Sequence, residues 1–131
     1  MGEFNKAKIL LEKAVTSAEN NFGVDHPSTA IRYSNLALVL KNLGDFEQAK
    51  VLLEKAVKSD EKKFGLDHPS TAIRYSNLAT VLQDLKEYED AKILSEKAYQ
   101  IFKTKLGVHH PNTQTVKEIL DHTISLLDKD Q

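Results

Sequence analysis

A chain of 131 residues with 40% hydrophobic and 28% charged residues can bury a core of ordinary size and is too apolar to stay disordered. Its formal net charge of −1 leaves no basic surplus to neutralise phosphates, so the composition does not indicate nucleic-acid binding. No apolar run approaches the ~20 residues that span a bilayer, no secretory leader pattern opens the chain, and cysteine is absent, which together favour a cytoplasmic protein without a membrane role.

The chain repeats itself with a period of 42 residues. The block Asp25–Ala37 recurs letter for letter at Asp67–Ala79, and the alignment of residues 22–63 with residues 64–105 gives 26 identities in 42 positions. Glycines and prolines share this spacing, at Gly23, Gly65, Gly107, Pro27, Pro69 and Pro111. A period of this length is typical of stacked supersecondary units, which offer extended binding surfaces. The sequence therefore predicts a single helical array over residues 1–131.

The first expected element is a helix over residues 2–22. Its start, Gly2-Glu3-Phe4, aligns with Gly44-Asp45-Phe46, where the second helix of a repeat begins. We name this second type helix B, and the first helix of each repeat helix A. No helix A precedes residues 2–22 in the sequence, so we expect one apolar side of this helix to be uncovered.

Two full repeats follow, residues 23–64 and 65–106, and each is predicted to form a helix pair. In both, a glycine suits the left-handed conformation that ends a helix, and the proline that follows suits the first helical position. His26, His68 and His110 lie at or near the N-cap, with Ser28 and Ser70 as alternatives. The expected bounds are Pro27–Asn42 and Pro69–Asp84 for helix A, and Asp45–Lys63 and Glu87–Lys105 for helix B.

The apolar residues of each helix fall on one side at ~100° per residue. For helix A they are Ala30, Tyr33, Leu36, Ala37, Leu40 and Leu43. For helix B they are Phe46, Ala49, Leu52, Leu53, Ala56, Val57 and Phe64, then Tyr88, Ala91, Leu94, Ala98 and Phe102. Asp60 is the exception, because it lies on the apolar side where the other copies have Ala18 and Phe102. We expect it to be either exposed at a gap in the packing or paired with a lysine.

The last element, expected over residues 111–129, departs from the helix A pattern. Ile119 takes the place of Asn77, and Asp121 takes the place of Ala79. Terminal units of a solenoid are often atypical because they cap the stack, so a C-terminal capping helix is predicted. The expected order is six helices, B-A-B-A-B-A.

These helix pairs resemble the tetratricopeptide repeat. Tyr33-x2-Leu36-Ala37-x2-Leu40 matches the helix A pattern of that family, and Gly44-x-Phe46-x2-Ala49-x3-Leu53-x2-Ala56 matches its helix B pattern. The period of 42 residues, the His-Pro at the start of helix A and the Asn-Leu-Ala in its middle are similar to the kinesin-light-chain type of repeat. The resemblance implies an all-α fold, a right-handed α-solenoid of stacked antiparallel helix pairs, that acts as a protein-binding scaffold without a cofactor. Kinesin light chains carry more repeats and an upstream coiled coil, so cargo transport is not inferred.

The resemblance also implies a concave groove lined by the side of helix A opposite its core. That side carries Ile31, Arg32, Asn35, Leu38 and Asn42 in the first repeat, and Ile73, Arg74, Asn77, Thr80 and Asp84 in the second. An asparagine amide donates and accepts at once, which suits it to an extended peptide backbone. The alternative is that these residues are ordinary exposed ones. The two arginines would either bind an acidic side chain of a ligand or form surface ion pairs with a neighbouring helix.

Enzymatic and metal chemistry are not indicated. The histidines that recur every 42 residues lie in different repeats, and packed helices are about 8–10 Å apart. Two zinc ligands must both approach within about 2.1 Å of the metal. These histidines are therefore expected to be local caps. His109 and His110 are adjacent and poorly suited to joint ligation, and His122 is expected on the surface. Asp25-His26-x-Ser28 holds the residue types of a hydrolytic triad, but neighbours at the start of a helix point apart.

Three functions follow from these observations. The first is a protein-interaction scaffold that binds an extended peptide or a partner helix in the groove. The second is self-association, as a homodimer or an end-to-end stack through the uncovered side of residues 2–22. The third is a sensor segment of a larger signalling protein.

Overall fold

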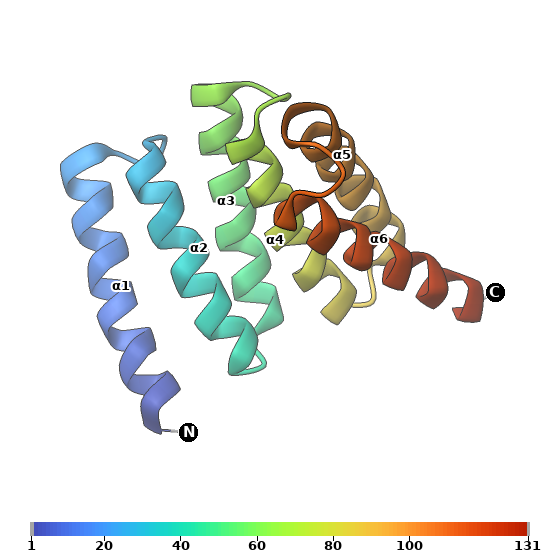
Figure 1. The fold of residues 1–131 in the computed structure, drawn as a ribbon. Coiled ribbons are helices and arrows are strands. Elements are labelled where there is room, and N and C mark those ends of the chain that lie inside the picture. Colours follow the sequence, from blue (N-terminus) through green and yellow to red (C-terminus); the bar gives the residue numbers. More distant parts are fainter. Residues whose placement is uncertain (1, 131) are drawn as a thin grey trace. The chain divides into compact units, whose positions relative to one another are not determined.

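The computed structural model describes residues 2–130, which form six α-helices and no strand (Figure 1). The helices are α1 (Gly2–Phe22), α2 (Pro27–Asn42), α3 (Phe46–Phe64), α4 (Pro69–Asp84), α5 (Tyr88–Leu106) and α6 (Pro111–Asp130). The chain divides into two compact units after Gly65, at the start of the second repeat. The predicted all-α class and the B-A-B-A-B-A order are confirmed. None of the helices within residues 2–130 is both long and apolar enough to cross a membrane.

The predicted helix bounds hold closely, because local signals set them. Both A helices begin at the proline and end where expected, whereas α3 and α5 each begin one residue later than predicted. The reason is capping. Asp45 is the N-cap of α3, and its Oδ1 accepts a hydrogen bond from the backbone N–H of Gln48 at 3.3 Å. Glu87 holds the same position before α5.

Histidine caps each A-type helix, as one of the two alternatives predicted. The Nδ1 atoms of His26, His68 and His110 accept hydrogen bonds from the backbone N–H two residues later, at 3.0, 3.0 and 3.1 Å. The ring of His26 also stacks on Phe22, with centroids 4.7 Å apart. These contacts satisfy a backbone donor at the start of each helix, which is the usual task of an N-cap side chain.

In the first unit, α1, α2 and α3 lie side by side and alternate in direction, and α2 packs against both neighbours (Figure 1). The side of α2 that faces them contains the predicted apolar residues, which are buried apart from the half-buried Leu43. Tyr33 is the largest of them. Its hydroxyl donates a hydrogen bond to Oε2 of Glu19 at 2.6 Å, so it ties α2 to α1. The α3 contribution includes Ala49, Leu53, Ala56 and Val57.

In the second unit, α5 packs against both α4 and α6, and α6 also contacts α4. Nε2 of Gln83 donates hydrogen bonds to the carbonyl of Ile119 at 3.1 Å and to Oγ1 of Thr123 at 2.6 Å, which joins α4 to α6. The buried apolar residues are Ala72, Tyr75, Leu78, Ala79, Val81, Leu82, Ala91, Ala98, Ile101, Phe102, Val116 and Leu120.

Asp60 is buried, with 1% of its surface exposed. Exposure at a gap in the packing, one of the two alternatives for this residue, is therefore wrong. Its neighbour Ser59 is buried as well. Part of the apolar side of α3 is thus polar inside the protein.

The outer side of α6 is polar where the equivalent side of α4 is apolar. Gln114, Lys117 and Asp121 are exposed, and they occupy the positions of the buried Ala72, Tyr75 and Ala79. Nζ of Lys117 pairs with Oδ1 of Asp121 at 2.9 Å, one helical turn away. A further helix B packed on this side would have to desolvate both charges, so the polar side supports the predicted capping role.

The turn between helix A and helix B differs between the two repeats. Gly44 adopts the left-handed conformation with φ of 84°, and the equivalent Lys86 adopts it with φ of 62°. A side chain in this conformation costs roughly 1–2 kcal/mol. Lys86 is therefore a strained position in the second repeat.

We expect Lys86→Gly to stabilise the protein by about 0.5–1 kcal/mol, since relief of strain exceeds the backbone entropy that glycine adds to the unfolded chain. Gly44→Lys is the mirror experiment and should destabilise it by a similar amount. A Cβ at Gly44 would meet no atom within 4 Å, so backbone conformation alone is tested. Urea unfolding of both variants measures the change. A loss of stability in Lys86→Gly would contradict the assignment of strain.

The Tyr33–Glu19 hydrogen bond gives a second prediction. Burial, and then the contact with Glu19, raises the pKa of Tyr33 well above its ordinary value. Tyr33→Phe should lower the free energy of unfolding by about 1–2 kcal/mol at neutral pH. Above about pH 10 the unfolded tyrosine ionises while the folded one stays protonated, so wild-type stability falls and the difference between the two proteins narrows.

Urea unfolding at neutral pH and near the wild-type alkaline limit would measure this difference. Tyr99→Phe is the matched control, because within residues 2–130 the hydroxyl of Tyr99 forms no hydrogen bond. A constant difference between wild type and Tyr33→Phe at all pH values would show that the hydroxyl is not held as described.

Candidate functional site

The binding residues predicted on the first repeat lie together on one side of α2. We call this set the α2 stripe: Ile31, Arg32, Asn35, Leu38 and Asn42. All five are exposed, and they lie opposite the side of α2 that is buried against α1 and α3. Within residues 2–130, the side chains of Arg32 and Asn35 form no hydrogen bond or ion pair. Their donors and acceptors are therefore available to a partner, and the surface ion pair considered for Arg32 is absent.

The equivalent set on α4, which we call the α4 stripe, is less open. It consists of Ile73, Arg74, Asn77, Thr80 and Asp84. Ile73 and Asp84 are exposed, whereas Arg74, Asn77 and Thr80 are half-buried. The hydroxyl of Thr80 donates a hydrogen bond to the backbone carbonyl of Asn77 at 2.7 Å, so it is used within the helix. The two stripes differ in residue type at two of the five positions, and in exposure at three of them.

The residue types of a hydrolytic triad are not assembled around His26. Oδ2 of Asp25 pairs with Nζ of Lys62 at 2.8 Å, and Nδ1 of His26 accepts from the backbone of Ser28. Within residues 2–130 no group of three histidine, aspartate or glutamate side chains is close enough to hold a metal ion. His109 and His122 are exposed, as expected for His122.

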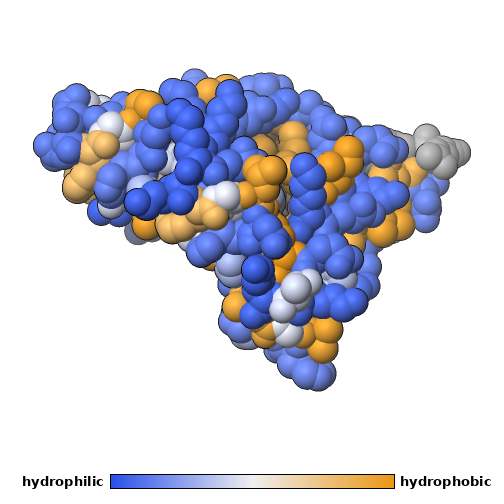
Figure 2. Space-filling model, turned by 90° about the horizontal axis from the view of Figure 1, so that it is seen from above, coloured by the Kyte–Doolittle hydropathy of each residue, from blue (hydrophilic) through white to orange (hydrophobic). Residues whose placement is uncertain are grey.

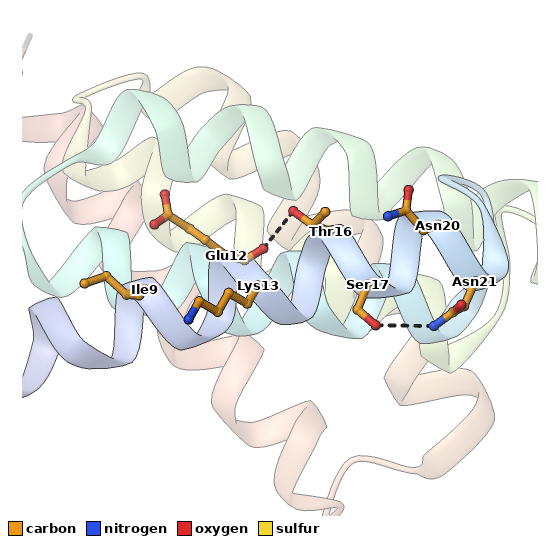
Figure 3. A pocket seen from close by; sticks show the side chains of 7 residues that line it. All are labelled: Ile9, Glu12, Lys13, Thr16, Ser17, Asn20 and Asn21. Carbon is orange, nitrogen blue, oxygen red and sulfur yellow. Dashed lines mark hydrogen bonds between the residues drawn. The ribbon is translucent and has the colours of Figure 1, made fainter.

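A shallow hollow runs along α1 (Figure 3). All seven of its residues lie on that one helix: Ile9, Glu12, Lys13, Thr16, Ser17, Asn20 and Asn21. The hydroxyl of Thr16 donates to the carbonyl of Glu12, and the amide of Asn21 donates to Oγ of Ser17. A surface formed by a single helix cannot enclose a ligand, because ligand sites bury most of the ligand between several walls.

An apolar side of α1 is exposed, as expected for the first helix. Leu10 is 66% exposed, whereas the equivalent Leu52 and Leu94 are half-buried. Phe4 is exposed as well, and its equivalents Phe46 and Tyr88 are half-buried. Within its unit, α1 packs against α2 alone.

The structure shows one further site that the sequence analysis missed. It is a pocket of about 520 Å³ on the outer side of α5, which we call the α5 patch: Leu66, Tyr75, Ile93, Glu96, Lys97, Gln100 and Ile101. Tyr75 and Ile101 are buried and form its base, while Leu66 and Ile93 are exposed at its edge. Nζ of Lys97 lies 5.9 Å from the centroid of the Tyr75 ring, a cation–π contact.

The surface around these sites is mostly polar. Figure 2 shows a largely hydrophilic face on which hydrophobic side chains form several separate groups. Single exposed apolar residues are normal, but groups of them mark interaction sites. The exposed apolar residues of the α2 stripe, of α1 and of the α5 patch are therefore the candidates for contact with other molecules.

Comparisons with known proteins agree with the fold. The sequence profile of the tetratricopeptide repeat family matches residues 1–62 and 33–104. A kinesin light chain-like protein of Podosopora anserina with nearly identical TPR-like repeats is similar in structure, with a TM-score of 0.85 and 25% identity over 98% of this chain and 65% of that chain. A variant of the same protein gives a TM-score of 0.85 at 24% identity, again over 98% and 65% of the two chains.

BtubC (BKLC) from P. vanneervenii is similar with a TM-score of 0.75 and 21% identity, over 98% of this chain and 55% of that chain. The chain thus spans less than two thirds of the length of these three structures. No curated protein sequence matches it. The two overlapping profile matches cover most of the chain, and its helix pairs have the kinesin light chain-like form: the chain belongs to the tetratricopeptide repeat family.

Proposed function

We propose that the chain is a protein-interaction scaffold that binds an extended peptide or a partner helix on the α2 stripe and the α4 stripe. The observation that carries this proposal is the row of five exposed residues on α2, opposite its buried side. Membership of a family of repeat scaffolds supports it. A cytoplasmic location and the lack of a catalytic activity are part of the same proposal, in keeping with a chain that contains no cysteine.

The chemistry of the α2 stripe suits a peptide backbone. Asn35 has an amide that forms no hydrogen bond within residues 2–130, and an amide can pair with both the N–H and the C=O of a main chain. Ile31 and Leu38 are exposed on either side of it along the helix. Burial of each against a partner would contribute on the order of 1 kcal/mol, because part of each side chain is already covered.

The α4 stripe would make a more polar contact with the same partner. Thr80 replaces Leu38 and Asp84 replaces Asn42, while Ile73 and Asn77 are retained. The shared isoleucine and asparagine would form the common part of the two contacts. The substituted positions would then decide which side chains of the partner face each repeat.

The test replaces both asparagines, Asn35→Leu together with Asn77→Leu. Peptides selected from a random displayed library on the wild-type protein supply the ligand, and titration calorimetry gives the affinity. Loss of two backbone contacts of about 0.5–1.5 kcal/mol each predicts a Kd that is about 5- to 150-fold weaker.

The matched control is Asn5→Leu together with Asn20→Leu, two exposed asparagines on α1 that lie outside both stripes. It should leave the affinity unchanged, and circular dichroism should show the same helicity in all three proteins. Unchanged affinity in the double variant of the stripes, or an equal loss in the control, would disprove the proposed site.

A further inference from the structure

Two positions of the repeat are apolar and exposed in all three copies. The residue after the repeat glycine is Val24, Leu66 or Val108, and all three are exposed. The second position, on the outer side of helix B, is Ile9, Val51 or Ile93, and these are exposed too. In each B helix the same pair of charged residues begins three positions later, at Glu12-Lys13, Glu54-Lys55 and Glu96-Lys97.

The stripes lack this constancy. Asn35 and Asn77 become Ile119 in the last A-type helix, and Leu38 becomes Thr80 and then His122. At these positions, the outer side of helix B therefore varies less in residue type between repeats than the predicted groove does. The lysine of the Glu-Lys pair makes the same contact in two repeats. Nζ of Lys55 lies 5.7 Å from the centroid of the Tyr33 ring, and Nζ of Lys97 lies over the ring of Tyr75 in the same way.

The α5 copy of this surface lines a pocket with four apolar or aromatic side chains, Leu66, Tyr75, Ile93 and Ile101. Ile101 forms part of its base, where α3 has Ser59 and α1 has Ser17. Gln100 is neutral, where α3 has the charged Lys58. Leu66 is 67% exposed and Ile93 is 49% exposed, so two aliphatic side chains project beside the pocket.

We propose that the α5 patch is the contact surface of a homodimer, in which the patches of two copies pack about a two-fold axis. Such an interface is isologous, so one surface must supply both halves of every contact. The α5 patch does so. It has a pocket and projecting aliphatic side chains to fill it, and it has adjacent charges of opposite sign, Glu96 and Lys97.

The charges are available for pairing between copies. Within residues 2–130 neither Glu96 nor Lys97 forms an ion pair. Across a two-fold axis, Glu96 of each copy would meet Lys97 of the other, which gives two equivalent ion pairs around an apolar centre. The patch has seven residues, whereas a standard interface has about 20–30 on each side, so we expect a weak dimer.

Sedimentation equilibrium on the wild-type chain, over about 10 µM to 1 mM, tests the proposal across the range expected of a small interface. The weight-average mass should rise with concentration from 14.7 kDa towards twice that value. Ile93→Asp should hold it at the monomer mass throughout. Val51→Asp, the same change at the equivalent position of α3, is the matched control and should leave the rise unchanged.

Charge exchange makes the test specific to a two-fold contact. Glu96→Lys alone places two positive charges together at each of the two equivalent pairs across the axis, so it should abolish the rise in mass. Glu96→Lys combined with Lys97→Glu restores opposite charges across the axis and should restore the dimer. The four substituted residues, Val51, Ile93, Glu96 and Lys97, are all exposed, and thermal melts of each variant check that folding is preserved.

Several outcomes would overturn the proposal. One is a wild-type chain that stays monomeric at every concentration. Another is a dimer that survives Ile93→Asp but is lost in Leu10→Asp, which would place the contact on the exposed side of α1. A dimer that the double charge exchange fails to restore would also exclude the two-fold pairing of Glu96 with Lys97.

Discussion

Close packing of helix A on helix B is the constraint on which the rest of the structure depends. Small residues on the buried sides make it possible, and these alanines are buried almost completely: Ala30, Ala37, Ala49, Ala56, Ala72, Ala79, Ala91 and Ala98. A small side chain lets two helices approach closely, and a larger one would force them apart at the cost of neighbouring contacts. Tyr33 of α2 and Tyr75 of α4 are buried in the same cores, and the hydroxyl of Tyr33 also donates a hydrogen bond to Glu19 of α1.

This constraint decides which residues can serve function. The buried side of each helix is used by packing, and the N-cap histidines and the glycine turns are used by the connections. Among the described residues, the exposed sides that packing does not use include the outer sides of α2, α4 and α5 and one side of α1. The functional proposals rest on these surfaces, since a scaffold contributes specificity through the residues that its own packing does not need.

Local signals made most of the fold predictable. Proline, histidine and glycine fixed the helix ends to within one residue, because caps act over a few neighbouring positions, and the apolar periodicity identified the buried sides. The burial of Asp60 was not decided, since the pattern gives the side of a helix but not what covers it. The α5 patch was missed because residues that line its pocket, such as Leu66 and Ile101, are distant in sequence and come together only in the folded unit.

A signal for the patch was nevertheless present in the repeats. Exposed residues of helix B read as a solvated side when each helix is considered alone, and charges such as Glu96 and Lys97 support that interpretation. Comparison of the copies shows instead that an aliphatic residue is kept beside them each time, at Ile9, Val51 and Ile93. In a repeat protein, the positions that stay apolar while exposed carry more information on contacts than the composition of any one helix.

The stripes and the α5 patch share no residue, so the two proposed contacts are compatible in one molecule. The proposed dimer contact on α5 uses neither Asn35 nor Asn77. Two sets of stripes on one assembly would bind a partner with two copies of a motif more tightly than a partner with one, because the second contact becomes intramolecular. A weak dimer would then strengthen with occupancy, since a bivalent partner adds its own link between the two copies. Self-association and scaffolding, which are alternatives when the sequence is considered alone, would then be two parts of one mechanism.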